Sequence, residues 1–160
     1  MESKNLSHRV FHSPHYFIAF GFGSGLSPIA PGTCGTLAAM PIYLLLSYLS
    51  WPLYVLWLVA AFAIGVWVSD QVSRELKVHD FSGIVWDECL GYWMTMFLAP
   101  VGWIWMLYGF ILFRVFDIWK PLWIGKADKY VKGGLGIMLD DVLAAIPAWV
   151  VLHIIAWGSS

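Results

Sequence analysis

Charged residues are scarce in this chain. Lys, Arg, Asp and Glu make up 12% of the 160 residues, whereas 60% are apolar and the mean hydropathy is +0.73. An ordinary soluble domain carries about 25% charged residues. So few charges cannot cover the surface of a water-soluble domain of this length, and lipid must therefore be part of the solvent. We expect an integral membrane protein that forms one domain over residues 1–160.

Basic tracts and cysteine pairs are also lacking. The formal net charge is −1, and no run of basic residues alternates with aromatic ones, so nucleic-acid binding is not expected. The two cysteines, Cys34 and Cys89, lie far apart in the sequence without CxxC spacing. A disulfide framework or a zinc site is therefore not expected either.

The few charges fall into three clusters, at residues 2–9, 70–88 and 114–141. The first cluster lies in a polar N-terminal tail, residues 1–16. The apolar stretches between and after the clusters are Leu37–Leu49, Pro52–Val68, Leu90–Phe113 and Val142–Trp157. A membrane span needs about 20 apolar residues, so the first two stretches are individually short. Only Ser50 and Trp51 separate them, which predicts a helical hairpin.

The third apolar stretch predicts a second hairpin, because residues 99–102, Ala-Pro-Val-Gly, form a strong turn signal in its middle. We expect its arms at Val85–Ala99 and Trp103–Trp119, followed by a last helix at Val142–Trp157. The predicted fold is an all-α, polytopic membrane bundle of about five helices: two hairpins plus a C-terminal helix. All Lys and Arg residues then lie on one side, which the positive-inside rule makes cytoplasmic.

Carboxylates are concentrated at the ends of the predicted helices on that side. They are Asp87, Glu88, Asp117, Asp140 and Asp141. Packed carboxylates repel one another, and burial raises the cost of ionising each one. A hard cation resolves both problems, and Mg²⁺ typically binds a few carboxylates together with substrate phosphate. The alternative is that these residues are acids favoured near helix N-termini by capping and by the helix dipole.

Basic residues flank one of these carboxylates. Arg114, Asp117 and Lys120 are spaced i, i+3, i+6 and share one helix face. An Arg and a Lys around a carboxylate suit a phosphate held against a metal. The alternative is a snorkelling basic helix end with one intrahelical ion pair.

Several loop segments are further candidates. Residues 27–36, SPIAPGTCGT, are too broken by Pro and Gly for a regular span, and Thr33 and Thr36 could line a polar cavity or belong to a structural loop. Residues 133–136, GGLG, are a weak phosphate motif, and a plain flexible loop explains them as well. His79 and Asp80 could act as a base or support the acids, or form a solvated loop pair.

Four motifs together resemble the phosphatidylglycerophosphatase A family. They are GFGSGLSPIAPGTCGT, HDFSGIVWDECLG, FRVFDIWKP and GGLGIMLDD, in this order, and the resemblance extends from about Phe17 to Ile155. It implies a magnesium-dependent phosphatase of the bacterial inner membrane with its active site facing the cytoplasm. Such an enzyme removes the terminal phosphate of phosphatidylglycerophosphate to give phosphatidylglycerol, a step of phospholipid biosynthesis.

The resemblance also implies roles for individual residues. The metal ligands would be Asp87, Glu88, Asp117, Asp140 and Asp141. Arg114 and Lys120 would hold the phosphate, and Thr33 and Thr36 would occupy the substrate-binding PGT segment. For the chemistry itself we expect metal-assisted hydrolysis with Asp87 or Asp141 as general base, and a phospho-aspartate intermediate is the alternative. A lipid phosphomonoester has a tail that needs the bilayer and a head that needs cations, so the residues and the resemblance agree.

Two other classes of function predict a different placement of the carboxylates. A small cation or proton transporter would carry its carboxylates at mid-span, whereas here they lie at helix ends. A non-catalytic membrane subunit would scatter its acids over solvated loops and would show no metal dependence.

Overall fold

The computed structural model describes residues 2–78, 81–119 and 131–159. Within these ranges the regular structure is entirely helical, as predicted. The elements are α1 (Glu2–His12), α2 (Pro14–Ala19), the short 3₁₀ helix η1 (Gly21–Leu26), α3 (Pro31–Leu46), α4 (Trp51–Leu76), α5 (Trp86–Thr95), α6 (Trp103–Trp119) and α8 (Gly134–Gly158).

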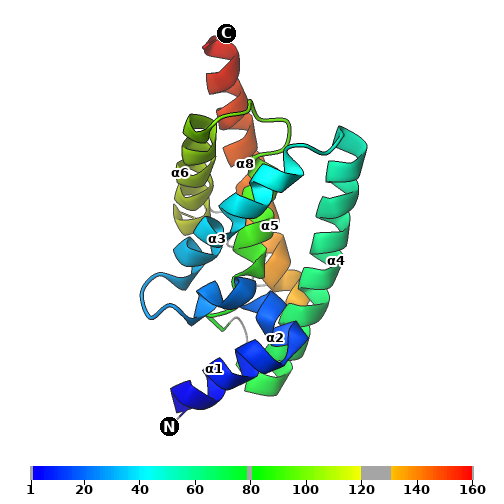
Figure 1. The fold of residues 1–160 in the computed structure, drawn as a ribbon, viewed down its shortest axis with the longest axis vertical. Coiled ribbons are helices and arrows are strands. Elements are labelled where there is room, and N and C mark those ends of the chain that lie inside the picture. The colour runs from blue at the N-terminus through cyan, green and yellow to red at the C-terminus, as the bar shows by residue number, and fades with distance from the viewer. Residues whose placement is uncertain (1, 79–80, 120–130, 160) are drawn as a thin grey trace.

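The longer helices alternate in direction along the bundle (Figure 1). A tight connection at residues 47–50 joins α3 to α4, and a second at residues 96–102 joins α5 to α6. The N-termini of α3, α5 and α8 and the C-termini of α4 and α6 therefore meet at one end, the lower end in Figure 1. This arrangement agrees with two hairpins followed by a last helix.

Two of the described helices, α4 and α8, are long and apolar enough to cross a membrane, judged by length and composition. By contrast α5 has 10 residues and is only about 15 Å long at 1.5 Å per residue. The predicted arm Val85–Ala99 was too long, because the chain turns after Thr95 and Leu98 adopts a positive φ of 58°.

Two further segments also differ from the prediction. The last helix begins at Gly134, eight residues before the predicted start at Val142, so Asp140 and Asp141 lie in its second turn and do not open it. The N-terminal segment is not a polar tail, since it forms α1 and α2. Val10 and Tyr16 pack there with Val68 and Val72 of α4 in a small core of their own.

Helix α5 is the centre of the bundle, and most of its residues are buried. Trp93 is fully buried, with edge-on contacts to Trp57 and Trp86 at ring-centroid distances of 5.6 and 5.5 Å. Its indole N–H donates to the carbonyl of Ala39 on α3 at 3.0 Å, and its own carbonyl accepts from the Tyr54 hydroxyl on α4 at 2.8 Å. One side chain thus joins α3, α4 and α5.

We expect Trp93→Ala to destabilise the fold by about 3–5 kcal/mol, because it leaves a cavity and breaks the bond to α3. Trp93→Phe fills most of that cavity and should lose little beyond the hydrogen bond, about 1 kcal/mol. Thermal unfolding of both variants in one detergent measures the difference. Equal Tm values for Trp93→Ala and wild type would show that this residue does not join the helices.

Candidate active site

The predicted carboxylates meet at the end of the bundle where the helix termini converge. Asp87 and Glu88 lie in the first turn of α5, Asp117 lies near the end of α6, and Asp140 and Asp141 lie in the second turn of α8. All five line one cavity of about 290 Å³. Its other lining residues are Ala30, Pro31, Gly32, Ser82, Ile84, Arg114 and Ile137.

Three of the carboxylates form a tighter group. Asp87, Glu88 and Asp141 each offer an oxygen, and the three oxygens lie within 4.8 Å of one another. Asp87 and Asp141 are buried, and Glu88 is partly buried. A helix dipole favours Asp87 and Glu88 at the N-terminus of α5. It does not explain Asp141 in the second turn of α8 or Asp117 near the C-terminal end of α6, so the helix-start alternative covers only part of the group.

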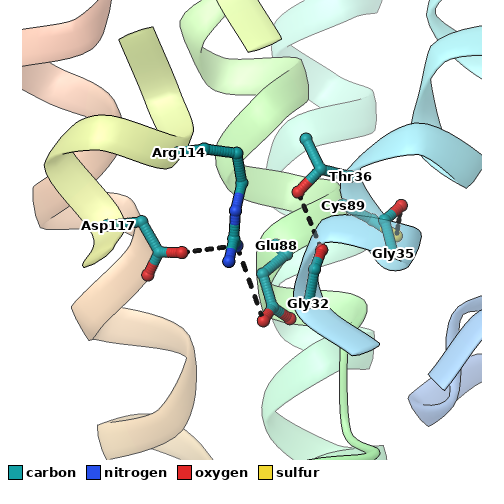
Figure 2. A network of polar contacts seen from close by, with 7 residues as sticks. All are labelled: Gly32, Gly35, Thr36, Glu88, Cys89, Arg114 and Asp117. Carbon is teal, nitrogen blue, oxygen red and sulfur yellow. Dashed lines mark hydrogen bonds and ion pairs between the residues drawn. The ribbon is translucent and has the colours of Figure 1, made fainter. Parts of the chain in front are cut away.

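Among the described residues that line this cavity, Arg114 is the only Lys or Arg. Its Nη1 forms an ion pair with Asp117 at 2.5 Å and lies 3.8 Å from Glu88 Oε1 (Figure 2). The side chain is 14% exposed, and its buried Nε has no hydrogen-bond partner in the part of the chain that the structure describes. The guanidinium therefore keeps a donor for an anion.

The first turn of α3 closes the cavity beside Glu88. A Cβ on Gly32 would lie 2.1 Å from Glu88 Oε1 and 3.2 Å from Arg114 Nη1, so the bare backbone of α3 touches both charged groups. Glycine is required for so close an approach. Gly32 was not among the predicted site residues, although it precedes Thr33 in the Pro-Gly-Thr segment.

The sequence predicted a broken loop segment at the two threonines, but the structure places both of them on α3. Thr36 is fully buried, and its hydroxyl donates to the carbonyl of Gly32 at 3.0 Å, so its hydrogen bond is made within α3 (Figure 2). Thr33 is partly buried, and neither threonine is among the residues lining the cavity. Their substrate-binding role stays a prediction.

Three other predicted residues, Lys120, His79 and Asp80, lie outside the described residues. The glycine-rich segment 133–136 has an ordinary structural explanation. Gly134 and Gly136 belong to α8, and Gly134 packs so tightly on α4 that a Cβ would lie 2.0 Å from the carbonyl oxygen of Val66. Ser82, Ile84 and Ile137 were not selected from the sequence, because one serine and two isoleucines carry no distinctive pattern.

The donor set fits a hard divalent cation. Three carboxylate oxygens from two helices converge in a largely buried space, where their mutual repulsion needs a positive charge. Oxygen ligands of this kind suit Mg²⁺. A cation held there, with the Arg114 guanidinium nearby, would form a positively charged surface for a phosphate group.

Comparisons with known proteins give one consistent picture. A family model described as Phosphatidylglycerophosphatase A matches residues 17–156. The chain is 44% identical over 144 residues to phosphatidylglycerophosphatase A of Escherichia coli (strain K12), covering 89% of this chain and 84% of that protein.

Two further relatives are similar over most of their length. Phosphatidylglycerophosphatase A of Haemophilus influenzae is 40% identical, with 91% of this chain and 90% of that protein covered. A protein of Bacteroides thetaiotaomicron named putative phosphatidylinositol-3-phosphatase is 38% identical, with 88% and 92% covered. No solved structure matches the chain.

Proposed function

Since the chain belongs to the phosphatidylglycerophosphatase A family and is therefore a phosphatase, we propose that it removes the terminal phosphate of phosphatidylglycerophosphate to give phosphatidylglycerol. The observation that carries the proposal is the cavity that holds Asp87, Glu88 and Asp141 beside Arg114, at one end of a bundle of apolar helices. This step would serve phospholipid biosynthesis.

The proposed setting is the bacterial inner membrane, crossed several times. Helices α4 and α8 are long and apolar enough to cross it, and the shorter helices α3, α5 and α6 pack beside them. Arg74 and Lys77 at the end of α4, Arg114 on α6 and Lys132 before α8 all belong to the end that holds the cavity. Cytoplasmic loops carry an excess of Lys and Arg, so we place the active site on the cytoplasmic face.

The proposed cofactor is Mg²⁺, held by Asp87, Glu88 and Asp141, with Asp140 on the same wall. When bound, it would neutralise phosphate charge and favour attack by water. Arg114 donates to a phosphate oxygen and stabilises the charge that develops in the transition state. Asp87 or Asp141 accepts the proton of the attacking water. In an alternative route a carboxylate attacks the phosphorus, the ester bond to the lipid glycerol breaks and phosphatidylglycerol leaves as the alcohol, and water then hydrolyses the phospho-aspartate to release phosphate.

The test is phosphate release from phosphatidylglycerophosphate in detergent micelles by the purified chain. We expect hydrolysis with Mg²⁺, loss of activity with EDTA, and recovery when excess Mg²⁺ is added back. A folded protein that releases no phosphate with any divalent ion would contradict the proposal. Activity that persists in EDTA would contradict the metal but not the phosphatase.

The relative from Bacteroides thetaiotaomicron is named for a different lipid head group, so head-group specificity needs a separate test. Phosphatidylinositol 3-phosphate and phosphatidate should therefore be assayed beside phosphatidylglycerophosphate. We expect the highest kcat/KM with phosphatidylglycerophosphate, because the two relatives with higher identity are named for it. A higher value with the inositol lipid would transfer the assignment to that head group and leave the phosphatase chemistry unchanged.

A further inference from the structure

Asp117 differs from the other carboxylates of the cavity in what it contacts. The group of oxygens within 4.8 Å comprises Asp87, Glu88 and Asp141, and Asp117 is not part of it. Its Oδ2 instead contacts Arg114 Nη1, one helical turn earlier on α6. Figure 2 shows Arg114 between the two carboxylates, with Asp117 on one side and Glu88 on the other.

The two ion pairs of Arg114 are unequal. The contact with Asp117 is 2.5 Å, whereas the distance to Glu88 is 3.8 Å and lies beyond hydrogen-bond range. Both side chains of the closer pair are largely withdrawn from solvent, at 14% and 10% exposure. A close Arg–carboxylate contact with little solvent around it restrains the position of the guanidinium. Asp117 is therefore the group that orients Arg114.

The position of Asp117 on α6 supports the same reading. It lies in the last turn of the helix, which ends at Trp119, and the dipole there disfavours a negative charge. The residue is only 8% exposed, so it needs a nearby cation, which Arg114 supplies within the same helix. The stabilisation of Asp117 is thus accounted for without a metal ion.

We infer that Asp117 is a positioning residue for Arg114 and not a ligand of the divalent cation. This differs from the expectation drawn from the sequence, in which Asp117 was one of five carboxylates around the cation. The carboxylate holds one edge of the guanidinium, which leaves Nε to donate to a phosphate oxygen. This inference rests on the proposed function, because it divides the work of one site between a cation and Arg114.

The first test measures metal binding without turnover. Asp87→Asn and Asp117→Asn make the same chemical change at residues with the same exposure, 8% each. Mn²⁺ binding to the purified full chain in detergent is followed by the electron paramagnetic resonance signal of free Mn²⁺. We expect Asp87→Asn to weaken Mn²⁺ binding by about tenfold or more and Asp117→Asn by less than about threefold. Equal weakening by both variants would overturn the inference.

The second test measures the anion side of the site through inhibition by inorganic phosphate. We expect Asp117→Asn and Arg114→Met each to raise the inhibition constant by about tenfold. The double variant should be no worse than Arg114→Met alone, because Asp117 acts through Arg114. Independent, multiplying effects of the two substitutions would overturn the inference.

Two controls separate the possible failures. Circular dichroism and gel filtration establish folding, and if Asp117→Asn does not fold, Asp117→Glu takes its place. Asp117→Glu keeps the negative charge, so we expect its Mn²⁺ binding to be unchanged. Its inhibition constant for inorganic phosphate should lie between those of wild type and Arg114→Met. Weakened Mn²⁺ binding in Asp117→Glu would overturn the inference. A folded wild type that binds no Mn²⁺ would overturn the proposed metal site itself. If the wild type binds Mn²⁺ and both Asp87→Asn and Asp117→Asn lose the same amount of Mn²⁺ affinity, only the role of Asp117 is overturned.

Discussion

Asp141→Asn is expected to release phosphate from phosphatidylglycerophosphate at less than about 1% of the wild-type rate. Asp141 is 3% exposed, and its carboxylate oxygen is one of the three that lie within 4.8 Å of one another. The substitution keeps the shape of the side chain but removes the negative charge. Removing one group that stabilises charge in an enclosed site typically costs about 10²–10³ in kcat, and weaker binding of the cation adds to this loss.

The matched control is Glu75→Gln, which also converts one carboxylate to its amide. Glu75 is exposed on α4, pairs with His15 at 3.3 Å and is not among the residues lining the cavity. We expect this variant to keep wild-type activity. Phosphate release by folded Asp141→Asn at more than about one tenth of the wild-type rate would contradict the assignment of Asp141 to the site, whatever the control shows.

The order of the helices could be predicted because it depends on strong and local signals. Proline at Pro52, and Pro100 with Gly102, mark the two hairpin connections, and both connections lie there in the structure. The start of α6 at Trp103 and its end at Trp119 also agree with the prediction. Apolar residues between turn signals have few alternatives to a helix in such a chain.

The start of the last helix could not be predicted, because the sequence before it contains residues that usually end helices. Gly133, Gly134 and Gly136 read as a loop, yet two of them lie inside α8. Gly134 is a glycine because its tight packing on Val66 and Asp70 of α4 leaves no room for a side chain. Packing between distant elements here overrides local propensity, and it places Asp140 and Asp141 inside a helix.

The composition of the candidate site could be predicted, but not its division into parts. Two acidic doublets and Asp117 were selected from the sequence, and the structure brings all of them to one cavity. That Asp87, Glu88 and Asp141 form one group while Asp117 faces Arg114 depends on the packing of α8 against both α5 and α6. Spacing along the chain contains no information on those distances.

Gly32→Ala is expected to give a folded protein with a damaged site. The new Cβ would lie 2.1 Å from Glu88 Oε1, which is the end of a flexible side chain, so Glu88 moves away and the helix remains. Alanine is also favoured over glycine inside a helix by about 1 kcal/mol. A displacement of about 1 Å in a catalytic group can cost 10²-fold in rate. We therefore expect kcat to fall by about 100-fold and Mn²⁺ binding to weaken, with little change in Tm.

Gly35→Ala, one turn further along α3, provides the contrast. Its Cβ would lie 2.7 Å from the Cβ of Val85, an atom fixed to the backbone just before α5, so the helices themselves must separate. We expect this variant to lower the Tm more than Gly32→Ala and to impair the site less directly. The close approach of Gly32 leaves Glu88 Oε1 little room on the α3 side, so the bare glycine helps to set the position of that side chain. Wild-type rates for Gly32→Ala would show that Glu88 does not need this restraint.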